Sequence, residues 1–168
     1  MVLPTPPLQT GPGPSSSSAE ELRLGELLAY GALDTPPDQG LDELTRLAAR
    51  LFQVPIALVS LVDDHRQWFK SRVGLLATET PREQAFCAHA IAQPDVMVVE
   101  DAQADPRFEA NPLVVGAPGI RFYAGAPLIT PAGQALGTLC VIDSLPRQFS
   151  VGEREALQVL SRQVMAQL

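Results

Sequence analysis

The chain has 168 residues, 46% of them hydrophobic, which suffices for one domain with a core but not for two complete domains. Nineteen acidic side chains against twelve basic ones give a net charge of -7, and no stretch gathers Lys and Arg as a nucleic-acid-binding surface requires. No apolar run approaches the roughly 20 residues needed to cross a bilayer. We therefore expect a soluble protein that binds neither nucleic acid nor membranes.

The first 18 residues are rich in Pro, Ser and Gly, and they lack the basic start and apolar centre of an export signal. This composition predicts a disordered tail over residues 1–18 and a single domain over residues 19–168. The two cysteines, Cys87 and Cys140, each lie in an apolar segment, which favours reduced core residues over a disulfide framework. Together these features predict a cytoplasmic location.

Helix starts are marked by Ser or Thr followed three residues later by an acid, because such pairs satisfy exposed backbone N–H groups. Four pairs fit this pattern: Ser18 with Glu21, Thr35 with Asp38, Thr80 with Glu83, and Ser150 with Glu153. The first two predict helices that run to about Tyr30 and over residues 36–52. Residues 54–73 follow as a hairpin, with a polar break at residues 63–65 between two strands.

The second half of the chain begins with a short predicted helix over residues 81–92. An apolar run at residues 96–99 predicts a central strand, and a long irregular connection over residues 101–121 is typical of functional or disordered segments. Residues 121–143 predict a second hairpin around a Pro-Ala-Gly turn. The final helix, from Ser150, carries Leu157, Leu160, Val164 and Leu168 on one side, and we expect a stalk or a dimer seam there. Hairpins separated by helices indicate an α+β domain.

Seven segments of this pattern occur in the order known from one family. They are LDTPPD (33–38), VPIALVSLVD (54–63), RQWFKSRVGL (66–75), FCAHAI (86–91), DPRF (105–108), FYAGAPL (122–128) and GTLCVID (137–143). From about Leu24 onward the chain resembles the GAF family of sensory domains, of the type that precedes bacterial histidine kinase and diguanylate cyclase modules. The resemblance implies a six-stranded antiparallel sheet with helices on its faces and with the N- and C-terminal helices packed together. It also implies a ligand pocket between the sheet and residues 101–121.

The candidate ligand-binding residues are polar or aromatic groups that this pocket would bring together: Arg121, Tyr123, Arg107, Phe108, Asp105, Cys87 and His89. Arg107 offers a donor fork suited to a carboxylate or phosphate, and Phe108 offers a stacking face. The alternative is that Asp105 caps a helical turn and that Arg107 pairs with it or with Glu109. Arg121 and Tyr123 lie on one face of their strand and are the strongest polar candidates.

Metal binding and cofactor attachment are not expected. Cys87 and His89 are two positions apart on a predicted helix, about 200° around its axis, so they cannot chelate one metal ion. Related photoreceptors hold a bilin through a Cys that is usually followed by His. Here Cys87 is followed by Ala88, and Arg107 occupies the cysteine position of a photoreceptor signature, which disfavours a covalent bilin.

The resemblance implies a small-molecule-binding regulatory domain of bacterial signal transduction, including two-component systems, with no catalytic residues and no enzymatic activity. We expect an unidentified ligand, a homodimer formed through the terminal helices, and coupling to an output domain in a longer protein. One alternative is an enzyme similar to the thiol-dependent free methionine sulfoxide reductases, although the two cysteines do not match that family's catalytic set. Another alternative is a dimerisation module without a ligand.

Overall fold

Residues 16–168 of the chain, described in a computed structural model, form one six-stranded antiparallel sheet. Its strands are β1 (Ile56–Val62), β2 (Arg66–Val73), β3 (Glu79–Pro81), β4 (Met97–Val99), β5 (Phe122–Ile129) and β6 (Ala135–Asp143). They lie in the order β3-β2-β1-β6-β5-β4, so that β1 and β6 occupy the centre. Both predicted hairpins are present, as β1–β2 and β5–β6, and the α+β fold class is confirmed.

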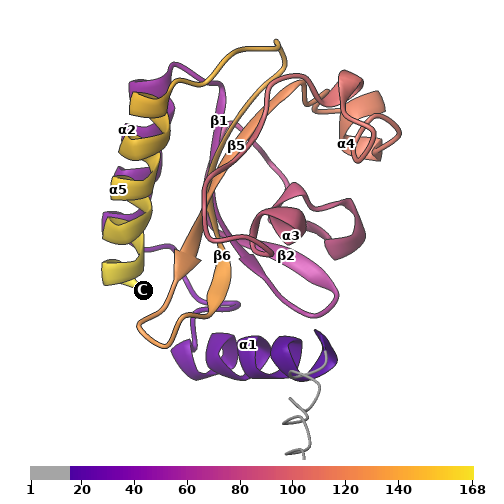
Figure 1. The fold of residues 1–168 in the computed structure, drawn as a ribbon. Helices are drawn as coiled ribbons and strands as arrows, with labels where there is room; N and C mark the ends of the chain where they lie inside the picture. The colour runs from indigo at the N-terminus through magenta and orange to yellow at the C-terminus, as the bar shows by residue number, and fades with distance from the viewer. Residues whose placement is uncertain (1–15) are drawn as a thin grey trace, which may run out of the picture.

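Helices cover both faces of the sheet, as Figure 1 shows. They are α1 (Ser16–Tyr30), α2 (Gln39–Phe52), α3 (Phe86–Ala90), α4 (Pro112–Val115) and α5 (Val151–Gln167), with short 3₁₀ turns at Arg82–Gln84 and Ala102–Ala104. The long helices α2 and α5 lie side by side on one face, whereas α3 and α4 lie on the other. Helix α1 crosses one end of the sheet and contacts β6.

Each face of the sheet has its own hydrophobic core, because successive side chains of a strand point to opposite faces. Ala57, Val59 and Leu61 of β1 pack with α2 and α5, whereas Ile56 and Leu58 of the same strand pack with α3 and α4. Burial on both faces explains why β1 and β5 read as continuous apolar runs. The core beneath α3 and α4 is where the candidate site lies.

Two of the predicted helix starts differ from the structure because their threonines have other partners. Helix α2 begins after Asp38, whose carboxylate accepts the Leu41 N–H at 2.9 Å, whereas Thr35 donates to the Ala32 carbonyl. Thr80 belongs to β3 and pairs with Gln67, so the third helix is shortened to a 3₁₀ turn and α3. The box at Ser150 and Glu153 is confirmed, with both of its hydrogen bonds present.

The run at residues 96–99 was expected to be a central strand, and that expectation is wrong. It forms β4, which pairs with β5 and lies at the edge of the sheet. Met97 and Val99 are buried by the helical layer and not by a second neighbouring strand. An apolar run indicates that the side chains are buried, but it does not indicate the position of the strand within the sheet.

The apolar stripe on the last helix, expected to form a stalk or a dimer seam, packs inside this chain. Leu157, Leu160 and Val164 are buried in this chain's own core, where α5 packs on β5 and beside α2. The resemblance also implies that the N- and C-terminal helices pack together. In the structure α5 packs beside α2, whereas α1 crosses the end of the sheet and contacts β6. The tail predicted over residues 1–18 falls outside the described residues, except for Ser16–Ser18, which begin α1.

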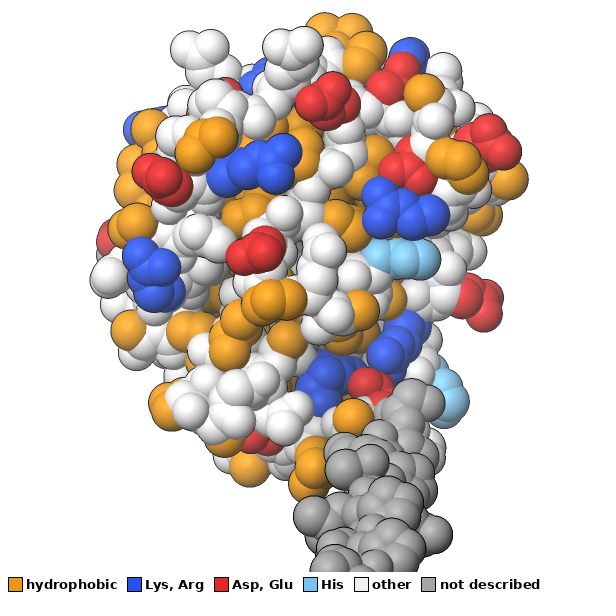
Figure 2. Space-filling view, in the orientation of Figure 1, with side chains coloured by type: hydrophobic (Ala, Val, Ile, Leu, Met, Phe, Trp, Pro, Cys, Tyr) orange, Lys and Arg blue, Asp and Glu red, His pale blue; other side chains and the backbone are white. Residues whose placement is uncertain are grey.

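The surface of the described residues mixes both signs of charge. On the face drawn in Figure 2, Lys and Arg side chains alternate with acidic and apolar ones, with no broad basic patch. Within residues 16–168 there is no helix with the length and apolar character needed to span a membrane.

Candidate functional site

A cavity of about 310 Å³ lies between the sheet and the layer of α3 and α4. This size is at the lower end of the range for small-molecule sites. The lining residues are mostly apolar, and they include no Asp, Glu, Lys, Arg or His: Ile56, Leu58, Gln67, Phe69, Gly74, Leu75, Leu76, Ala77, Thr80, Phe86, Cys87, Leu113, Ala117, Pro118, Ile120, Tyr123, Cys140 and Ile142. An anion in this cavity would lose its hydration without gaining a cationic partner.

The floor of the cavity is the sheet, and its rim consists of two loops. Ile56, Leu58, Cys140 and Ile142 come from the central strands β1 and β6, which are paired in register. The rim includes residues 75–77, where the Arg72 guanidinium donates to the carbonyl oxygens of Leu75 and Leu76 at 3.1 Å. The opposite rim consists of Leu113, Ala117 and Pro118.

Leu76 is 95% exposed although it lines an apolar cavity. An apolar side chain at such a position gains burial when a ligand occupies the site, since contact with the ligand removes its surface from water. The rim loop therefore leaves apolar surface exposed to water at the cavity.

The polar groups of the cavity gather around Cys87. Its sulfur lies 3.0 Å from the Thr138 hydroxyl and 3.2 Å from the Tyr123 hydroxyl. Tyr123 reaches this position by lying over Gly125, where an added Cβ would be 2.2 Å from the phenol oxygen. Glycine at residue 125 is thus needed for space, and the close approach is by a side chain.

Protonation of the two thiols is linked. Burial by itself raises the pKa of Cys87, but hydrogen bonds from Cys140, Thr138 and Tyr123 outweigh burial and lower it below the ordinary thiol range. The pKa of Cys140 is raised well above its usual value, by its hydrogen bond to Cys87 and by burial. Because the hydroxyls of Tyr123 and Thr138 contact the Cys87 sulfur, they favour negative charge on this sulfur.

A second polar group, the Gln67 amide, is fixed by its neighbours. Gln67 is 5% exposed, its nitrogen donates to the Thr80 hydroxyl at 2.6 Å, and its oxygen accepts from the Ser60 hydroxyl at 3.1 Å. These bonds join β1, β2 and β3 across one side of the cavity. They hold a neutral hydrogen-bonding group beside the apolar space.

Of the seven candidates from the sequence, the cavity brings together Cys87 and Tyr123. Arg121 lies outside it and forms a two-bond ion pair with Asp101 at 2.8 and 2.9 Å. The pair lowers the pKa of the Asp101 carboxyl, chiefly through the hydrogen bonds from Arg121. Arg121 is thus occupied by a carboxylate of its own chain, and no anion contact at this residue is needed to explain its position.

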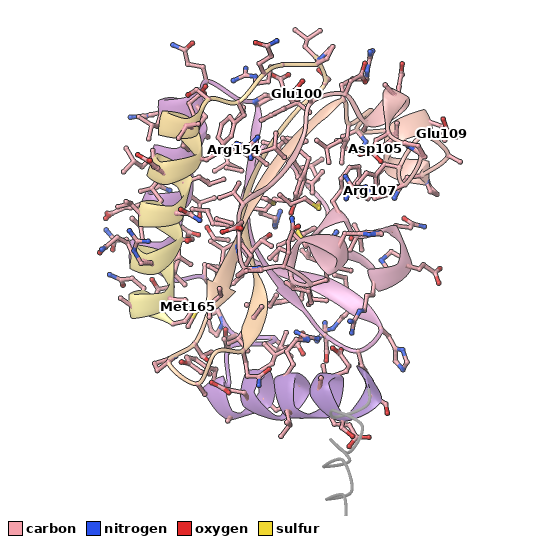
Figure 3. All side chains as sticks on the ribbon, in the orientation of Figure 1. Glu100, Asp105, Arg107, Glu109, Arg154 and Met165 are labelled. Carbon is pink, nitrogen blue, oxygen red and sulfur yellow. The ribbon has the colours of Figure 1, made fainter. Side chains whose placement is uncertain are left out.

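Arg107 and Asp105 pair with each other, with the guanidinium 2.8 Å from the carboxylate. Figure 3 places them with Glu109 in the segment beside α4 at the outside of the helical layer. The structure therefore shows the alternative prediction, in which Arg107 pairs locally with Asp105, and not an anion-binding lid.

The remaining two candidates contact each other outside the cavity. Phe108 is buried and stacks on Phe86 at 4.0 Å between ring centroids, so it anchors the loop to α3. His89 is exposed and meets the edge of Phe108 at 4.9 Å. In residues 16–168 no group of three metal-binding side chains comes together.

Sequence reasoning missed the polar residues that line or support the cavity: Gln67, Thr80, Thr138 and Cys140. One signal was available in the sequence. Gln67 is two positions from the apolar Phe69 on a strand, and this spacing places the polar Gln67 side chain on the same inward face. The same spacing of two places Thr138 and Cys140 on one face of β6. Their convergence on Cys87 depends on α3 and could not be read from spacing.

This architecture is that of a sensory domain. The family model of the GAF domain matches residues 36–168, and the chain belongs to that family. Solved structures agree in fold: a GAF domain of a phosphoenolpyruvate-protein phosphotransferase from Coxiella burnetii has a TM-score of 0.65 at 15% identity, over 90% of this chain and 94% of that one. The free methionine-R-sulfoxide reductase from Neisseria meningitidis has a TM-score of 0.63 at 20% identity, over 95% and 93% of the two chains. At these identities the likeness concerns the fold alone.

A closer relative is a cyclic di-GMP phosphodiesterase from Pseudomonas aeruginosa, which is 44% identical over 163 residues. The match covers 96% of this chain and 27% of the relative, so the chain spans about a quarter of that protein. The expectation that the protein has no enzymatic activity is wrong in view of this relative, which is named as an enzyme.

Proposed function

We propose that this GAF domain binds an uncharged, largely apolar small molecule in the cavity and thereby regulates the hydrolysis of cyclic di-GMP. The observation that carries the ligand class is the cavity lining, which combines many apolar side chains with neutral amide, hydroxyl and thiol groups. The relative with 44% identity supports the connection to cyclic di-GMP. Two free cysteines are consistent with a reducing, cytoplasmic setting for this activity.

The same lining argues against two other ligands. A free amino acid such as methionine sulfoxide carries an ammonium and a carboxylate, and cyclic di-GMP carries two phosphates. Neither the carboxylate nor the phosphates would find a cationic partner among the cavity residues, and desolvating an unpaired ion is costly. We therefore place cyclic di-GMP at a different site, as the substrate that the domain controls.

A route from the cavity to α1 runs through Arg82. The cavity wall at Phe86 and Cys87 directly follows the 3₁₀ turn that contains Arg82. The Arg82 guanidinium pairs with Glu20 of α1 and donates to the Asp63 carbonyl at 3.1 Å. We infer that a ligand which shifts α3 alters the seating of α1, with a coupling of about 1–3 kcal/mol, as is typical of allosteric domains.

We also propose a homodimer, formed through the outer faces of α2 and α5. Leu47 and Leu51 of α2 are 48% and 54% exposed, and Val159 of α5 is 47% exposed. These two helices are neighbours, so their outer faces form one surface. We propose this surface as the dimer interface in place of the stripe of Leu157, Leu160 and Val164 on α5, which is buried in the core.

The ligand class is tested by calorimetry with two probes of matched shape, 2-naphthol and 2-naphthoate. We expect 2-naphthol to bind about tenfold or more tightly, a difference of about 1.4 kcal/mol, because the carboxylate has no cationic partner in the cavity. Equal binding, or a preference for 2-naphthoate, would contradict the proposal.

A variant pair on α4 locates the binding. Leu113 lines the cavity, whereas Val115 on the same helix is 73% exposed and does not. Leu113→Trp should block 2-naphthol, and Val115→Trp should bind it normally. The two variants are then assayed for cyclic di-GMP hydrolysis in a longer protein that carries this domain with an output domain. A change in hydrolysis with Leu113→Trp and not with Val115→Trp supports regulation. Identical hydrolysis by both variants would refute it.

A further inference from the structure

The cavity floor carries a thiol that hydrogen-bonding groups surround. Cys87, Tyr123 and Cys140 all line the cavity, and Thr138 adds a hydroxyl 3.0 Å from the Cys87 sulfur. A pocket that only held an apolar ligand by burial would need none of these groups. Hydroxyl groups at the Cys87 sulfur instead favour its charged form, because hydrogen bonds to a thiolate lower the pKa of the thiol.

We propose that Cys87 captures its ligand covalently, as a nucleophile toward an uncharged molecule with a carbon–carbon double bond conjugated to a carbonyl. Enones and quinones are members of this class. The inference rests on the proposed function, because it names the chemical class of the ligand that occupies the same cavity.

The step is an addition, and it balances without a co-reactant. The S–H bond of Cys87 breaks and its sulfur forms a bond to the β-carbon of the double bond. The π electron pair moves toward the carbonyl oxygen to give an enolate, and the proton that left the sulfur ends on the α-carbon. No group leaves, and no external oxidant or reductant is consumed.

The surrounding groups assign the reaction to Cys87 and not to Cys140. The hydroxyls of Tyr123 and Thr138 lie 3.2 and 3.0 Å from the Cys87 sulfur. The upward direction of the Cys140 pKa shift agrees with this assignment. A thiol that holds its proton is a poor nucleophile, since the thiolate is the reacting form.

Selectivity follows from the cavity. Cys87 is buried, so a reagent reaches the sulfur through the apolar space beneath the rim loops. A charged electrophile would have to leave water to take this path, whereas an apolar one gains by it. Capture should therefore depend on the apolar character of the electrophile as well as on its reactivity.

The test uses the full chain and two reagents with the same reactive group. N-phenylmaleimide is uncharged, whereas 4-maleimidobenzoic acid adds a carboxylate to the same ring. The chain has only two cysteines, so intact mass counts the adducts and peptide mapping locates them. We expect one adduct, at Cys87, and at least a tenfold slower reaction with the charged reagent. Protein unfolded in urea should give two adducts with either reagent.

Variants and competition complete the design. Cys140→Ser should still form the adduct, Cys87→Ser should not form one in the folded state, and 2-naphthol should slow the reaction of the natural sequence. Reaction first at Cys140, equal rates with both reagents, or no adduct in the folded protein would overturn the inference. If 2-naphthol binds but no adduct forms, covalent capture fails and the proposed function stands. If 2-naphthol does not bind either, the apolar-ligand function fails as well.

Discussion

Glu20 attaches α1 to the rest of the domain, and its removal gives a quantitative test of that contact. Its carboxylate accepts two hydrogen bonds from Arg23 at 2.9 Å and a third from Arg82. Arg23 is 6% exposed, and it also donates to the Ala135 carbonyl at 3.3 Å. These contacts, led by the hydrogen bonds from Arg23, lower the pKa of Glu20 from 4.5 to about 2.

The expected loss in Glu20→Gln follows from that shift. A difference of about 2.5 pKa units corresponds to about 3 kcal/mol between the charged and neutral forms. The Glu20 side chain is 32% exposed, so solvent screening reduces this figure to about 1–2 kcal/mol. We expect urea unfolding at pH 7 to show a loss of that size. Glu21→Gln, on the exposed side of the same helix, is the matched control and should change stability by less than about 0.5 kcal/mol.

The pH dependence of this difference has a definite sign. A carboxyl with a lowered folded-state pKa contributes its full stabilisation above pH 4.5, and it loses this contribution as the pH falls toward about 2. The stability difference between the natural sequence and Glu20→Gln should therefore be constant from pH 7 to about 5.5 and less than half as large at pH 3. A difference that is absent at pH 7, or that grows in acid, would refute the proposed attachment of α1.

Three further predictions concern the cavity and the surface. Gly125→Ala should destabilise the fold by about 1–3 kcal/mol in urea unfolding, because its Cβ would collide with the Tyr123 phenol; an unchanged midpoint would show that the ring moves freely. Arg121→Gln should leave 2-naphthol affinity unchanged in calorimetry, since its ion pair with Asp101 is partly exposed and outside the cavity; a clear loss of affinity would show that Arg121 contributes to binding. Leu47→Glu combined with Leu51→Glu should shift a dimer to a monomer in sedimentation, and a dimer that persists would exclude that surface.

The hairpins and the start of α5 could be predicted from sequence because each depends on neighbours within a few residues. The capping box at Ser150, for example, needs only the side chain three positions later. Thr80 shows the limit of this reasoning. It has the same local pattern, but it pairs with Gln67 in the sheet, and its hydroxyl accepts a hydrogen bond from the Gln67 amide in place of a bond from a helix N-terminus.

The amino-acid sequence by itself determined the alternation that places residues on one or the other face of each strand, because that period is a property of the extended backbone. Only the tertiary structure decided which side chains meet. Asp101 reaches Arg121 from 20 positions away, and α3 brings Cys87 onto Tyr123 and Thr138 from 36 and 51 positions away. Such contacts depend on how helices seat on the sheet, and no local periodicity encodes that seating.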